Sequence, residues 1–312
     1  MQSHILSWGR SLIERGAWYF APFSWIFALL IFLRNFLYDK GFFVSHSVSC
    51  PVVSIGNVVA GGTGKTPFVL SLAEKFAHKK VAILSRGYGK IPDEALLLKR
   101  RLSHAKVYIG KDRVFLANQA VKEGAELIIL DDGFQYRKLR RDFEIILLSN
   151  HDPFGKGRFL PFGFLRDDPK RMRKADVLFV KDRDFHLTLR RITNEKGDIF
   201  PTLQGWKVGI FSGIAHPTSF KKIVTSSGAT IVSEWSLADH ALASANRLNR
   251  FAKVCKALEA SALVTTEKDF VKGPKTLLPI LCLEVGIEWM QGQKKWENLI
   301  AKIERKLDNK HI

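Results

Sequence analysis

The chain has 312 residues, of which 46% are hydrophobic and 11% aromatic, and this composition excludes a disordered protein. Its length suggests about two domains. The formal net charge of +19 indicates an anionic partner, which leaves nucleic acid, an anionic membrane surface and a phosphorylated substrate as classes. Three scattered cysteines (Cys50, Cys255 and Cys282) lack the spacing of metal ligands, so we expect reduced thiols.

The first feature along the chain is an uncharged stretch from Gly16 to Leu33. As a helix it would measure about 27 Å, close to the thickness of the hydrocarbon layer of a membrane. Trp18 and Trp25 belong to a residue type that favours the membrane interface. We therefore predict a membrane-associated helix within residues 1–44. Spanning the bilayer and lying in one leaflet both remain open, and a core helix of a soluble protein is the alternative.

The second feature is a phosphate-binding loop. Residues 60–67 read AGGTGKTP, between an apolar run at 52–55 and a helical pattern at 68–76. Glycines allow backbone N–H groups to point at phosphate oxygens, and the following helix adds the positive end of its dipole. Lys65 is expected to reach the terminal phosphates of a nucleotide, and Thr66 to bind Mg²⁺. The predicted nucleotide-binding residues are Gly61, Gly62, Thr63, Gly64, Lys65 and Thr66. The alternative is a glycine-rich turn without function.

After the N-terminal segment, strand-like and helix-like stretches alternate, which predicts an α/β fold with a mostly parallel, P-loop-type sheet. A second series begins after residue 203 and predicts a smaller α/β domain. We expect domains at 45–203 and 204–312, the latter ending in a basic helix. The expected strands are 52–55, 81–84, 107–109, 127–130, 143–148 and 177–180, then 208–211, 230–232, 262–265 and 278–283.

Two carboxylates, Asp131 and Asp132, follow the apolar run 127–130. In P-loop enzymes such a residue approaches the Mg²⁺ ion held by the loop, although the pair could also open a turn with Gly133. Asp93 begins a helical pattern and is explained equally by helix capping. His240 lies beside a carboxylate, a setting suited to proton transfer.

Basic residues recur at 99–101, 137–141 and 170–174. Such runs usually form solvated faces. Together with the N-terminal segment, they could instead bind anionic lipid headgroups.

Read in order, these segments resemble the tetraacyldisaccharide 4′-kinase family of lipid A biosynthesis. The resemblance rests on the order and spacing of eight motifs: SIGNVVAGGTGKTP (54–67), SRGYG (85–89), DEALLL (93–98), DDGFQ (131–135), GRFLPFGFLRD (157–167), FSGIAHPTSF (211–220), ADH (238–240) and TTEKD (265–269).

The resemblance implies an enzyme that uses ATP and Mg²⁺ to phosphorylate the 4′-hydroxyl of a tetraacyldisaccharide 1-phosphate, at the cytoplasmic face of the inner membrane. By position, Lys65 and Thr66 match the phosphate and Mg²⁺ residues, and Asp131 and Asp132 match the acidic pair near the metal. Asp93 matches the proposed catalytic base and His240 its partner. Further active-site positions are Tyr88, Arg113, Gln135, Arg166 and Asp167.

The chain departs from the family pattern in four places. Only residues 89–92 separate its SRGY and DE motifs, where the family has a sizeable insertion. Pro92 replaces the usual Gly before Asp93. Phe162 and Phe164 replace a small residue and Pro, and Asp167 replaces the closing Glu. These differences concern the nucleotide lid and the acceptor pocket rather than the phosphate site.

Two other classes remain as alternatives. A membrane-recruited P-loop ATPase switch has a similar loop, but with Lys at the position of Ala60. A nucleic-acid-dependent motor is suggested only by net charge, and the sequence contains no nucleic-acid recognition motif. We therefore expect no nucleic-acid partner.

Overall fold

The computed structural model describes residues 18–87, 92–214, 217–237, 243–273 and 275–309. Backbone contacts divide the chain into two compact units. We call one the P-loop unit, made of Arg10–Gly87, Arg101–His186 and Ile287–Ile312, and the other, with Tyr88–Arg100 and Leu187–Gly286, the second unit.

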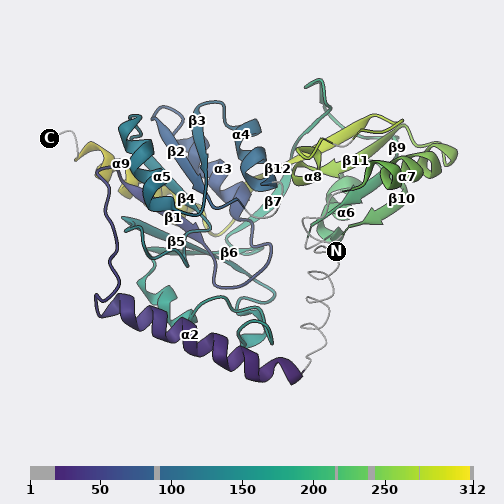
Figure 1. Ribbon diagram of the computed structural model, residues 1–312. Coiled ribbons are helices and arrows are strands. Elements are labelled where there is room, and N and C mark those ends of the chain that lie inside the picture. The colour runs from purple at the N-terminus through teal and green to yellow at the C-terminus, as the bar shows by residue number, and fades with distance from the viewer. Residues whose placement is uncertain (1–17, 88–91, 215–216, 238–242, 274, 310–312) are drawn as a thin grey trace. The chain divides into compact units, whose positions relative to one another are not determined.

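The P-loop unit is built on a parallel sheet with the strand order β6-β5-β1-β4-β2-β3 (Figure 1). Its central strands are mostly apolar and are buried along their whole length, as expected for a parallel sheet covered on both faces. The strands are β1 (Val52–Gly56), β2 (Val81–Ser85), β3 (Ala105–Ile109), β4 (Leu127–Asp131), β5 (Phe143–Ser149) and β6 (Val177–Lys181). The helices include α3 (Lys65–Lys75), α5 (Arg113–Lys122) and α9 (Gln293–Asp308).

This topology determines where polar side chains gather. Because the strands are parallel, the carboxyl ends of β1, β2 and β4 lie at one edge of the sheet, where ligands of open α/β sheets bind. The phosphate loop follows β1, and Asp131 ends β4. The sheet is held in place by aromatic packing behind α3, where Phe68 contacts the rings of Trp289 and Trp296.

The N-terminal helix α2 (Ala21–Asp39), preceded by the short helix η1 (Trp18–Phe20), lies along one side of the P-loop unit (Figure 1). Its buried side chains are Ser24, Ile31 and Asn35. By length and composition alone Trp18–Asp39 is suited to cross a membrane, and only 17% of its apolar 18-residue window is buried, unlike the core helix of a soluble protein. The exposed apolar side chains are Phe23, Trp25, Ile26, Leu29, Leu30, Phe32, Leu33 and Phe36.

The second unit has its own parallel strands in the order β10-β9-β11-β12. These are β9 (Lys207–Ser212), β10 (Thr230–Ser236), β11 (Ala262–Thr266) and β12 (Ile280–Trp289), of which β12 continues into the P-loop unit. Helices α4 (Asp93–Arg101), α6 (Pro217–Ser226), α7 (Ala245–Ala257) and α8 (Glu267–Phe270) accompany them. β7 (Phe185–Thr193) enters this unit and pairs antiparallel with β8 (Ile199–Phe200).

The predicted α/β fold with a mostly parallel sheet is confirmed, and each predicted strand overlaps an observed one. The sequence analysis missed β7, because its central residues 188–191 combine polar and charged side chains without an apolar run. The domain limits 45–203 and 204–312 stay a prediction, because contacts alone do not establish which segments fold independently. The contacts place α9 in the P-loop unit.

Candidate active site

The phosphate loop joins the end of β1 to the start of α3. Gly64 caps α3 with φ of 86°, a left-handed conformation that favours glycine. The Nδ2 of the buried Asn57 donates to Thr63 Oγ1 across the loop at 3.1 Å. The segment 164–166 holds the loop from outside: Ala60 N donates to Phe164 O, and Arg166 N donates to Val58 O. These bonds fix the loop, so Lys65 and the buried Thr66 begin α3 in defined positions.

The electrostatic centre of this region is Asp132, which is 8% exposed. Arg166 donates to it from both terminal guanidinium nitrogens, Nη2 at 2.7 Å and Nη1 at 3.0 Å, and Lys65 Nζ lies 3.5 Å from Asp132 Oδ1. Burial acts to raise the pKa of this carboxyl, but the charges of Lys65 and Arg166 outweigh it and hold the pKa well below its usual value. Asp132 is therefore a permanent anion that orients two cations.

Arg113 and Gln135, two further positions named from the family resemblance, contact the same loops. Arg113 donates to the carbonyls of Asp131 and Asp132 at 3.0 and 3.2 Å, and stacks on the Tyr136 ring. Gln135 Nε2 donates to Asn57 O at 2.8 Å. The structure thus brings Lys65, Asp132, Arg166, Arg113 and Gln135 into one polar network of the P-loop unit.

The donors available to Mg²⁺ are a hydroxyl and a carboxylate. Thr66 Oγ1 stands at the start of α3, and Asp131 ends β4 with Ser85 Oγ donating to its Oδ2 at 3.2 Å. Mg²⁺ is commonly held by one or two such ligands together with substrate phosphates. Within the described residues, no cluster of three His, Cys, Asp or Glu side chains is present. The donor set therefore fits Mg²⁺ bound together with a nucleotide.

Asp93 lies in the second unit, at the start of α4, and is buried. Its Oδ1 accepts the Glu94 backbone N–H at 2.9 Å, one residue on rather than the two or three residues of a helix cap, and Lys272 Nζ lies 3.5 Å from its Oδ2. The same nitrogen is 3.0 Å from Asp269, the last residue of the TTEKD motif. Asp93 therefore has a local backbone contact and a charged partner, and capping alone does not describe it.

Two predicted site residues, Tyr88 and His240, lie outside the described residues. Other polar residues of these networks were missed by the sequence analysis. Asn57 and Ser85 each follow or end a buried strand, and this position was the available signal. Lys272 follows the TTEKD motif with no local pattern to mark it.

Comparison with known proteins yields one family. The model of the tetraacyldisaccharide-1-P 4′-kinases matches residues 16–304. A tetraacyldisaccharide 4′-kinase of Chlamydia abortus is 33% identical, over 90% of this chain and 89% of that protein. One of Syntrophus aciditrophicus is also 33% identical, over 90% and 91% of the two chains.

A solved structure agrees with these sequence matches. The crystal structure of "apo" form LpxK from Aquifex aeolicus in complex with ATP superposes with a TM-score of 0.75 at 30% identity. The match covers 91% of this chain and 98% of the other.

Proposed function

This chain belongs to the tetraacyldisaccharide 4′-kinase family, and from that membership we propose how its own residues carry out the reaction. It is an ATP-dependent lipid kinase, which transfers the γ-phosphate of ATP to the 4′-hydroxyl of a tetraacyldisaccharide 1-phosphate in lipid A biosynthesis. A membrane-recruited ATPase switch without a lipid acceptor is not favoured by these matches.

The proposal for the phosphates rests on the Lys65–Asp132–Arg166 cluster. Phosphoryl transfer depends mainly on positioning and on stabilising charge. Lys65 would bind the terminal phosphates together with the N–H groups of residues 61–66. Asp132 keeps Lys65 aligned before the nucleotide binds, because its carboxylate lies 3.5 Å from the amine. Arg166 brings a second positive charge to the same carboxylate.

We propose that Thr66 and Asp131 hold Mg²⁺ with ATP. The ion would neutralise charge on the phosphates. Asp132, also expected at the metal, is bound by two cations, so it would act through its charge and by fixing Lys65.

Asp93 is the proposed base that accepts the proton of the 4′-hydroxyl, with His240 as its partner. Lys272 Nζ lies 3.5 Å from Asp93 Oδ2 and supplies an opposite charge beside the proposed base. The proposed substrate is the lipid disaccharide 1-phosphate itself.

The membrane proposal rests on the two faces of α2. Ser24 and Asn35 face the protein, whereas apolar side chains such as Leu29 and Leu33 are exposed. A helix with one face hydrogen-bonded to its own protein suits one leaflet better than a bilayer-spanning position. Exposed basic residues of helix η3 (Pro169–Lys174) adjoin the end of α2, where Lys174 contacts Asp39. They would bind anionic headgroups at the cytoplasmic face of the inner membrane.

One experiment tests the chemistry. Purified protein, [γ-³²P]ATP, Mg²⁺ and a defined tetraacyldisaccharide 1-phosphate are mixed in micelles, and the position of the new phosphate is mapped by mass spectrometry. We expect label at the 4′ position. ATP hydrolysis without labelled lipid would contradict the proposal and favour the ATPase switch.

A second experiment tests the membrane face. Leu29→Glu places a charge on the exposed face of α2, where Leu29 is 65% exposed. Leu277→Glu is the matched control, because Leu277 is 62% exposed in the second unit. We expect liposome flotation to fall for Leu29→Glu alone. Equal binding by both variants would refute α2 as the anchor.

A further inference from the structure

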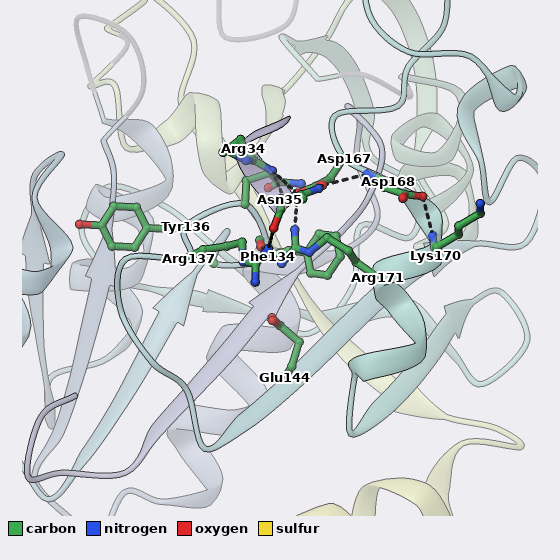
Figure 2. Close-up of polar contacts among 12 residues, drawn as sticks. Arg34, Asn35, Phe134, Tyr136, Arg137, Glu144, Asp167, Asp168, Lys170 and Arg171 are labelled. Atoms are coloured by element: carbon green, nitrogen blue, oxygen red, sulfur yellow. Dashed lines mark hydrogen bonds and ion pairs between the residues drawn. The ribbon is translucent and has the colours of Figure 1, made fainter. Parts of the chain in front are cut away.

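Two neighbouring residues, Arg166 and Asp167, connect different parts of the P-loop unit. Arg166 binds Asp132 and also Asn57 Oδ1 of the phosphate loop. Asp167 is completely buried and accepts hydrogen bonds from α2: Arg34 Nη2 at 2.7 Å and Asn35 Nδ2 at 2.8 Å (Figure 2). One peptide unit therefore separates the contacts of the membrane helix from those of the phosphate site.

Asp167 is held tightly in this position. Its own neighbour Asp168 N donates to Oδ1 at 2.8 Å, and Arg171 forms an ion pair with Oδ2. Burial lowers the pKa of Arg171 to about 10, so its guanidinium remains charged at neutral pH. Its Oδ1 thus binds two neutral donors and its Oδ2 two charged donors. A buried carboxylate held on both oxygens in this way has little freedom to rotate.

The same contacts reach the DDGFQ loop that carries Asp132. Arg171 Nη2 donates to Phe134 O at 3.2 Å, and its guanidinium lies 4.3 Å from the Phe134 ring centre. Arg137, two residues beyond that loop, donates to Asn35 O at 3.0 Å (Figure 2). The carboxyl-terminal half of α2 is thus tied to both segments that hold Asp132 and Arg166.

We infer that Arg34 and Asn35 of α2, acting through Asp167, are positioning residues for Arg166 in phosphoryl transfer. This inference rests on the proposed role of Arg166. Displacing Asp167 would move the Arg166 backbone, whose N–H is bonded to Val58 O of the phosphate loop at 2.8 Å. The membrane helix would then support the chemical step as well as attachment.

The test is a double-mutant cycle in detergent micelles at saturating substrates, where membrane recruitment does not limit the rate. Asn35→Ala removes the bond to Asp167, and we expect kcat to fall about ten-fold. Arg166→Ala should lower kcat about a hundred-fold. If Asn35 acts through Arg166, the double variant should be no more than about two-fold slower than Arg166→Ala.

Ser24→Ala is the matched control for looser attachment of α2. Ser24 is also buried on α2, but its hydroxyl donates to Phe159 O at 2.7 Å rather than to Asp167. We expect similar melting temperatures for Ser24→Ala and Asn35→Ala, and wild-type kcat only for Ser24→Ala. Arg34→Gln, at a side chain 28% exposed, repeats the cycle with a smaller risk of misfolding.

The outcomes separate the inference from the proposal beneath it. Wild-type kcat in Asn35→Ala and Arg34→Gln, or losses that multiply fully with Arg166→Ala, would overturn the link while leaving the role of Arg166 intact. Wild-type kcat in Arg166→Ala would overturn the role of Arg166 and the inference with it.

Discussion

Asp132 and Asp93 are both buried carboxylates that face a lysine, but their surroundings differ. In the P-loop unit, Asp132 accepts hydrogen bonds from both terminal guanidinium nitrogens of Arg166 and also lies beside Lys65. In the second unit, Lys272 is 3.5 Å from Asp93 and 3.0 Å from Asp269, so its charge is shared. The first arrangement fixes a charge permanently. The second places one shared cation beside the proposed base.

The largest expected loss of kcat comes from removing Lys65, the lysine beside Asp132. Lys65→Ala should lower kcat by about 10³–10⁵, because charge on the transferring phosphate loses its principal protein cation. Steady-state kinetics and thermal melting measure the effect. Lys75→Ala, at the other end of α3, is the control and should be active. Near-wild-type turnover in a folded Lys65→Ala protein would refute the assignment.

Asp93→Asn tests the other carboxylate. A helix cap tolerates Asn, whereas loss of a base is worth about 10²–10⁴ in rate. We expect the larger loss with unchanged ATP affinity, measured by single-turnover kinetics and nucleotide titration. Glu94→Gln is the control, since Glu94 is next to Asp93 in the first turn of α4 and is paired with Lys268 of α8. Full activity in Asp93→Asn would leave capping as the explanation.

His240→Ala extends this test. If the two residues act as a unit, the double variant with Asp93→Asn should lose less than the product of the two single losses. Independent, multiplying losses would contradict a shared role.

Asp132→Asn should lower kcat about a hundred-fold by releasing Lys65 and Arg166, and it should also change acid stability. The pKa of Asp132 is lowered in the folded state, so its contribution to stability is present above its unfolded value, about 3.9, and is lost as pH falls below it. Melting curves from pH 3 to 7 should show the two proteins converging as pH falls. A constant difference in melting temperature would contradict this linkage.

The smallest expected effect is that of Lys272→Met. Removing the cation 3.5 Å from Asp93 Oδ2 should lower kcat about three-fold, because the proposed base loses a charged neighbour that helps to hold it in place. Steady-state kinetics at saturating substrates measure the effect. An unchanged kcat would show that Lys272 only packs beside Asp93.

The sequence predicted site residues where a recognisable motif lies next to a predicted strand in the chain. Lys65 could be predicted from the glycine-rich loop between β1 and α3, and Asp132 because it directly follows the buried strand β4. The pairings that position these residues could not be predicted, because the partners are distant in the chain: Asn57 and Arg166 are 109 positions apart, and Asn35 and Asp167 are 132 positions apart. In the sequence, Asn35 is one polar residue just after an apolar run, and only folding shows its buried partner.

The two faces of α2 also predict how this helix tolerates sequence change. On the exposed face, residues such as Leu29 and Leu33 need only be apolar, so exchanges among Leu, Ile, Phe and Met should be nearly neutral. On the inner face, Ser24 donates to Phe159 O and Asn35 donates to the buried Asp167, and an apolar replacement removes that bond. If α2 is randomised and active variants are selected, the exposed positions should therefore accept many apolar residues. Positions 24 and 35 should return the same polar residues.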